Sequence, residues 1–185
     1  IYNKAAQQYP NDYRSFNNLG KLAFTAGDAA KAASYFKQAA AKNANAAEVN
    51  ANLGLCELVN DNVASAEAYL SKATGASAVN EALGNLYIKQ GQYQRAVNAF
   101  GDAKTNSAAQ AQILAKDYNK AKATLEAIKN PNAMTDYLMA IVGARTNNES
   151  LVSKSLKSAI AKDASIATKA ANDREFAKFA ASILK

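Results

Sequence analysis

The chain has 185 residues and a formal net charge of +7, and 49 % of its residues are hydrophobic. It contains no histidine, no tryptophan and a single cysteine, so the commonest general base near neutral pH is missing and an internal disulfide is impossible. Alanine and other strong helix formers dominate a length that suffices for one domain with a buried core. These properties exclude a histidine-based catalytic triad and predict an all-α protein, because strand-like alternation of Val, Ile and Thr is also absent.

The excess of positive charge is spread along the chain. Lys and Arg occur singly, and no basic run or arginine-rich helix gathers them. We therefore interpret them as a solvated surface and predict that nucleic acid is not the partner. No apolar stretch approaches the roughly 20 residues of a transmembrane helix, so we predict no membrane insertion of this segment.

Residues 1–12, "IYNKAAQQYPND", have apolar residues at helical spacing, Tyr2 and Ala5, ahead of Pro10. They match the second half of the unit that the following residues repeat. Half of such a unit cannot bury its apolar side alone. We therefore expect its partner helix to precede Ile1 in a longer protein.

Three consecutive segments then share one pattern: "FNNLGKLAFTAGDAAKAASYFKQAA", "NANLGLCELVNDNVASAEAYLSKAT" and "NEALGNLYIKQGQYQRAVNAFGDAK". Each has a Leu-Gly pair near its start, followed at constant spacing by an alanine, a large apolar residue and another alanine. These residues are Leu19-Gly20, Ala32, Phe36 and Ala39; Leu53-Gly54, Ala66, Leu70 and Ala73; and Leu83-Gly84, Ala96, Phe100 and Ala103. Two weaker copies without the Leu-Gly pair follow, in "AKDYNKAKATLEAI" and "MTDYLMAIVGARTNNESLVSKSLKSAI".

This pattern resembles the tetratricopeptide repeat (TPR), a helix–turn–helix unit of 34 residues. Tyr87, Tyr93 and Tyr118 also match the family's aromatic positions. The resemblance implies a right-handed superhelical solenoid of about five helix hairpins, forming a single domain over 1-185. We place the second helix of an incomplete repeat at 1-12, full repeats at 13-46, 47-76, 77-104, 105-132 and 133-163, and a capping segment at 164-185. In that segment Asp173 is a predicted N-cap, and Phe176, Phe179 and Ile183 form an apolar stripe.

The glycines of "LGNLYIKQGQYQRA" raise the question of a phosphate-binding loop. The stretch has no Gly-Lys-Ser/Thr ending, and the pattern before it is helical, so we exclude a nucleotide site. We predict instead that Gly20, Gly54 and Gly84 let helices approach closely. Gly27 and Gly91 are predicted to form left-handed turns, with Asp61 at the same position in the second copy.

In TPR solenoids the first helices of the repeats line a concave surface that commonly receives an extended peptide or a helix of a partner protein. The resemblance therefore implies a binding groove on residues between the packing positions of each first helix. The predicted groove residues are Asn17, Lys21, Thr25, Leu55, Val59, Glu81, Asn85, Lys89, Tyr137, Ile141 and Arg145. Asn18 and Asn52 occupy positions that the family often fills with Asn, and we interpret them as structural.

From these features we predict a non-catalytic protein–protein interaction scaffold with no cofactor, no metal and no small-molecule substrate. Two alternatives stay open: a regulatory or assembly domain of a larger envelope protein or enzyme, and a solenoid that binds a polyanion or glycan. The sequence, which is rich in Asn, Ala and Lys, is similar in composition to TPR proteins of bacterial cell envelopes. This similarity implies a bacterial periplasmic or outer-membrane-associated location, with the cytoplasm as the alternative.

Overall fold

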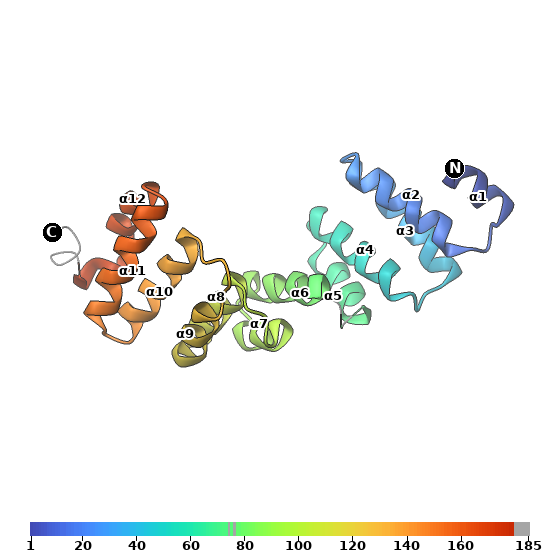
Figure 1. Cartoon of the computed structure of the whole chain (residues 1–185). Helices are drawn as coiled ribbons and strands as arrows, with labels where there is room; N and C mark the ends of the chain where they lie inside the picture. Colours follow the sequence, from blue (N-terminus) through green and yellow to red (C-terminus); the bar gives the residue numbers. More distant parts are fainter. Residues whose placement is uncertain (74, 76, 180–185) are drawn as a thin grey trace. The chain divides into compact units, whose positions relative to one another are not determined.

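The computed structural model describes residues 1–73, 75 and 77–179. These residues form twelve α-helices and one 3₁₀-helix, and no β-strand occurs among them. The chain divides into two compact units, Ile1–Leu86 and Tyr87–Lys185, and Figure 1 shows the helices of each along the colour gradient. The all-α prediction is confirmed.

The first unit consists of successive helices joined by short turns. Its helices are α1 (Tyr2–Gln8), α2 (Tyr13–Thr25), α3 (Ala29–Lys42), α4 (Ala47–Val59), α5 (Val63–Lys72) and the greater part of α6 (Ser77–Lys89). Helix α2 packs on α3 and α4 packs on α5, which gives two hairpins (Figure 1). Helix α3 also packs on α4, so the second helix of one hairpin contacts the first helix of the next.

The second unit continues the same arrangement. Its helices after α6 are α7 (Tyr93–Phe100), α8 (Asn106–Leu114), α9 (Tyr118–Glu126), α10 (Ala133–Arg145), α11 (Glu149–Lys162), α12 (Ser165–Asn172) and the 3₁₀-helix η1 (Arg174–Phe179). Helix α8 packs on α9 and α10 packs on α11, while η1 lies against α10 and α12. The predicted solenoid of successive helix hairpins is confirmed. Ile183 of the predicted apolar stripe lies outside the described residues.

One turn recurs between the two helices of every hairpin. Its central residue has a positive φ in each case: Gly27 (82°), Asp61 (58°), Gly91 (72°), Lys116 (65°) and Asn147 (55°). The next backbone N–H donates to the carbonyl five residues earlier, at 2.8–3.0 Å, in the pairs Asp28–Ala23, Asn62–Glu57, Gln92–Tyr87, Asp117–Gln112 and Asn148–Gly143. This satisfies a carbonyl at the end of the first helix, as a Schellman-type cap does. The predicted roles of Gly27, Gly91 and Asp61 are confirmed, and the turn persists where the Leu-Gly pair is lost.

Lys116 is the least suited of the five turn residues, because a left-handed backbone brings Cβ close to the following carbonyl, and Lys lacks the short polar side chain by which Asn and Asp tolerate this conformation. Replacing it with glycine is expected to raise the free energy of unfolding by about 0.5–1 kcal/mol. The matched control is Lys120→Gly inside α9, which is expected to lower it by about 1 kcal/mol. Urea denaturation of both variants shows whether each substitution raises or lowers the free energy of unfolding. An equal decrease in both variants would contradict the turn assignment.

Small residues and large ones alternate in the core of the first unit. Ala32, Ala39, Leu53 and Cys56 are fully buried there, and Phe36 is 2 % exposed. The Cys56 thiol donates to the carbonyl of Ala29 at 3.1 Å. Burial, and then the neighbouring Glu57, raise the pKa of this thiol, so it stays protonated and unreactive at neutral pH. The interpretation of Cys56 as an inert packing residue fits this environment.

Gly20 and Gly54 lie where two helices meet. A Cβ atom on Gly20 would come within 2.4 Å of the Phe36 ring, and one on Gly54 within 2.5 Å of Leu70 Cγ. Both glycines therefore permit a close approach that alanine does not. Their predicted role in packing is confirmed.

Candidate functional site

Three predicted groove residues of the first unit line one pocket. Lys21 and Thr25 come from α2 and Leu55 comes from α4, and the pocket between these helices has a volume of about 230 Å³. Its remaining lining residues are Phe24, Phe36 and Asn52. We call this site the α2–α4 pocket. It lies on two successive first helices, where the family's groove is expected.

The polar part of the α2–α4 pocket is built from two asparagines. Asn52 Nδ2 donates to Asn17 Oδ1 at 2.8 Å and so links α4 to α2. Asn17 is only 2 % exposed. The structure thus gives Asn17 a structural position beneath the groove, and it gives Asn52 a place on the pocket wall. Asn17, predicted as a groove residue, is thus buried, whereas Asn52, interpreted as structural, both links the two helices and lines the pocket.

The apolar part consists of Phe24, Leu55 and Phe36. The Phe24 side chain is 37 % exposed although it is a large aromatic, and Leu55 is half-buried, whereas Phe36 belongs to the core. Exposed aromatic surface beside a concave pocket is typical of a binding site. The pocket therefore offers an apolar floor next to polar edges.

Lys21 supplies the charge of this site. Its side chain is exposed, and no ion pair to it occurs in the described part of the chain. By contrast, Lys37 on α3 lies 3.6 Å from the buried carboxylate of Glu57. Because Lys21 is not neutralised within the fold, it is available to an anionic group of a ligand.

The other predicted groove residues of α4 and α6 are exposed. Val59 is 63 % exposed, and Glu81, Asn85 and Lys89 are also exposed. The structure does not bring these four residues into the α2–α4 pocket. Their part in binding a partner stays a prediction.

Two predicted groove residues of α10, Tyr137 and Arg145, are bonded to a later segment of the chain. Tyr137 is 2 % exposed, its hydroxyl donates to the Asp173 carboxylate, and Phe176 packs edge-on against its ring. Arg145 Nε donates to Glu175 at 2.7 Å, and Ile141 is half-buried. Burial, and then the bond to Asp173, raise the pKa of Tyr137 above its usual range. Tyr137 is therefore closed to a ligand by the segment Asp173–Phe179, whereas the Arg145 side chain is paired with Glu175 and stays 45 % exposed.

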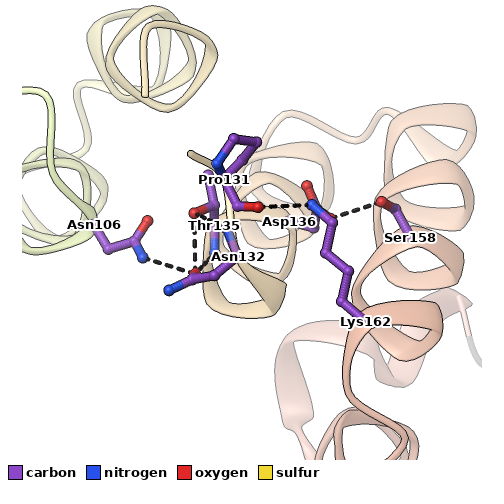
Figure 2. Close-up of polar contacts among 7 residues, drawn as sticks. All are labelled: Asn106, Pro131, Asn132, Thr135, Asp136, Ser158 and Lys162. Carbon is purple, nitrogen blue, oxygen red and sulfur yellow. Dashed lines mark hydrogen bonds and ion pairs between the residues drawn. The ribbon is translucent and has the colours of Figure 1, made fainter. Parts of the chain in front are cut away.

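A cluster of polar contacts fixes the start of α10 (Figure 2). Asn132 caps this helix by accepting from Thr135 N at 3.0 Å, and Thr135 Oγ1 accepts from Asn132 N. Lys162 on α11 lies 2.7 Å from Asp136, which also accepts from Ser158 at 2.7 Å. These charges are used in holding α10 to α11, so we assign them a structural role.

Sequence reasoning did not select Phe24 or Asn52 as groove residues, although it named Asn52 as structural and predicted the closing segment. Phe24 lies next to Thr25, one residue outside the register used to select groove positions. Asp173 accepts from the backbone N–H of Glu175 at 2.9 Å, which confirms its predicted capping role.

Two further observations limit the chemistry of the described residues. No group of three or more His, Cys, Asp or Glu side chains converges there as a metal site. In the same part of the chain, no helix combines the length and the apolar character needed to cross a membrane.

Solved structures with the same fold include several repeat proteins. YrrB, described as a TPR protein with an unusual peptide-binding site, has a TM-score of 0.78 and 18 % identity over 92 % of this chain and 97 % of its own. PilF of Pseudomonas aeruginosa has a TM-score of 0.74 and 16 % identity over 98 % and 86 %. PilW, described as a type IV pilus biogenesis factor, has a TM-score of 0.68 and 19 % identity over 100 % and 88 %. A search of the curated proteins gave no match.

Family models agree with the structural likeness. Two models described as tetratricopeptide repeat match residues 17–81 and 77–110, and together they span about half of the chain. The recurrent turn extends the same unit through α10 and α11. The chain therefore belongs to the tetratricopeptide repeat family.

Proposed function

We propose that this chain is a non-catalytic interaction scaffold that holds a peptide or helix of a partner protein on the first helices of its repeats. The observation that carries the proposal is the α2–α4 pocket, where the cation Lys21 lies beside an apolar floor. A pocket of this kind suits one apolar side chain of a partner and one neighbouring acidic group. The likeness to YrrB, whose description names a peptide-binding site, supports the same class of ligand.

The pocket would bind its ligand through three kinds of contact. Phe24 and Leu55 would remove an apolar side chain from water, which provides affinity. Asn52, held by Asn17, would orient the ligand backbone by a hydrogen bond, because its position is already fixed. Lys21 would favour a carboxylate and so select among peptides of similar hydrophobicity.

We also propose that the protein works in the bacterial cell envelope. This proposal rests on the style of the sequence, and the fold of PilW, described as a pilus biogenesis factor, is compatible with it. Fractionation of the cells that produce the protein, with antibodies to this chain, checks the location. Recovery with the cytosolic markers alone would contradict it.

A peptide library displayed on phage and selected on the whole chain tests the binding proposal without knowledge of the natural partner. The selected peptides are expected to lose at least about tenfold in affinity for the double variant Lys21→Glu/Leu55→Ala, because it removes both the charge and part of the apolar floor. Fluorescence anisotropy with synthetic copies of the peptides measures this loss.

Lys42→Glu provides the matched control, since Lys42 makes the same charge change at an exposed position of α3 outside the pocket. Circular dichroism establishes that each variant is folded. If the selected peptides bind the double variant as tightly as the Lys42→Glu control, the α2–α4 pocket is not the site and the proposal is wrong.

A further inference from the structure

The α2–α4 pocket is one end of a longer row of side chains on the first helices of the first two repeats. Residues at a spacing of three or four lie on one side of a helix and form the two edges of this row. On α2 they are Tyr13, Asn17, Lys21 and Thr25. On α4 they are Glu48, Asn52, Leu55 and Val59. We call these residues the α2–α4 row.

Two contacts show that α2 and α4 run side by side in the same direction. Tyr13, the first residue of α2, lies beside Glu48 in the first turn of α4. Burial, and then the negative charge of Glu48, raise the pKa of the Tyr13 hydroxyl, so it stays protonated at neutral pH. Further along both helices, Asn52 Nδ2 donates to Asn17 Oδ1 at 2.8 Å. Because the contacts follow the same order on α2 and α4, Glu48 and the pocket lie at opposite ends of the row.

The two ends of the α2–α4 row carry opposite charges. Glu48 is exposed, and among the described residues no ion pair neutralises it. Arg14, which follows Tyr13 on α2, is bound instead to Asp12, with Nε 2.9 Å from Oδ1 and Nη2 2.8 Å from Oδ2. Lys21 is the exposed cation at the pocket end. A ligand along the row therefore meets negative charge at one end and positive charge at the other.

The distance between these charges sets a spacing in the ligand. Lys21 comes eight residues after Tyr13, which corresponds to about 12 Å along the helix. An extended peptide advances about 3.3 Å per residue, so side chains that meet the two charges are about three or four residues apart. The asparagine pair between them favours an extended segment, because its backbone groups are not used in internal hydrogen bonds as those of a helix are.

We propose that the α2–α4 row selects an extended segment of a partner protein that has an acidic and a basic residue about three or four positions apart, with an apolar residue next to the acidic one. The acidic residue pairs with Lys21, the apolar residue enters the pocket beside Leu55, and the basic residue pairs with Glu48. This inference rests on the proposed function and adds the charge order of the ligand to it. The same charges disfavour the reversed orientation of the segment, since each would then meet a like charge.

Peptides selected on the whole chain from the phage-displayed library are the probes for this inference. Those that are weakened by Lys21→Glu/Leu55→Ala bind at the pocket. Glu48→Lys is expected to lower their affinity about three- to tenfold, because repulsion of the basic residue replaces attraction. Replacing that basic residue of the peptide with Glu is expected to weaken binding to the wild-type chain and to restore binding to the Glu48→Lys chain. Fluorescence anisotropy measures all four affinities.

Glu149→Lys provides the matched control, since Glu149 is also an exposed acid in the first turn of a helix but belongs to α11. It is expected to leave the affinities unchanged. If circular dichroism shows that Glu48→Lys is not folded, Glu48→Gln replaces it, because it removes the charge and keeps the size of the side chain.

Two results would overturn the inference, and they differ in what they say about the proposed function. If peptides that depend on Lys21 and Leu55 bind the Glu48→Lys and Glu149→Lys chains equally well, the charge order is wrong and the α2–α4 pocket remains the binding site. If none of the selected peptides depends on Lys21 and Leu55, the pocket is not the site, and the proposed function and the charge order are both wrong.

Discussion

Replacing Phe36 with alanine is expected to lower the free energy of unfolding by about 3–5 kcal/mol. Phe36 is 2 % exposed in the core of the first unit, and its ring touches the position where a Cβ of Gly20 would lie. The loss combines the transfer of the ring to water with the cavity left between α2 and α3. Urea denaturation followed by circular dichroism measures it.

Gly20→Ala tests the same contact, because the sign of its effect on the free energy of unfolding depends on whether Phe36 is present. In the wild-type chain the new methyl group would lie 2.4 Å from Phe36 Cε1, so we expect a loss of about 1–3 kcal/mol despite the better helix propensity of alanine. In the Phe36→Ala chain the same methyl group enters empty space, and Gly20→Ala is expected to be neutral or stabilising. Equal effects of Gly20→Ala in the two backgrounds would show that the two residues do not share this space.

Leu156→Ala is expected to destabilise the second unit by about 2–5 kcal/mol. Leu156 is fully buried on α11 together with Tyr137, Ala140 and Phe176. In repeat proteins each unit contacts mainly its neighbours, so we expect the effect to stay local. Hydrogen exchange should rise in α10, α11 and η1 and change little in α2 and α3.

The same variant distinguishes the closing segment from the α2–α4 pocket. Leu156→Ala is expected to weaken the contact between α10 and Asp173–Phe179, because that segment shares its core. Peptides selected on the α2–α4 pocket should keep their affinity. An equal rise in hydrogen exchange in all helices would contradict a local effect of the substitution. It would indicate that the chain unfolds as one cooperative unit.

The repeat could be predicted from sequence because packing fixes residue size at regular intervals. A glycine is required at positions 20 and 54 because the large side chains of Phe36 and Leu70 fill the space beside them. The repeated pairing of a glycine with a later large residue can be recognised from the sequence. The turn was predictable at Gly27, Gly91 and Asp61, whose residue types tolerate a positive φ. At Lys116 the same backbone is imposed by the helices on either side, and no local preference reveals it.

The exposure of groove residues was less predictable. Three predicted groove residues, Lys21, Thr25 and Leu55, line one pocket, since helical spacing determines which face a residue shares with its neighbours. It could not show that Asn17 bonds to Asn52, 35 residues away, or that Phe24 keeps part of its ring in water. Those outcomes depend on the angle at which α4 packs beside α2.

The sequence by itself thus determined the helical repeat, its turn chemistry and the face on which partners are expected, because these follow from local spacing and side-chain volume. Only the tertiary structure decided which part of that face is open. Tyr137 and Arg145 have the spacing of groove residues, yet Asp173 and Glu175 bind them from 36 and 30 residues away. Contacts at such separations, about one repeat apart, are those of neighbouring repeats, so the pattern predicts that the closing segment lies beside α10 but does not show which side chains bond there.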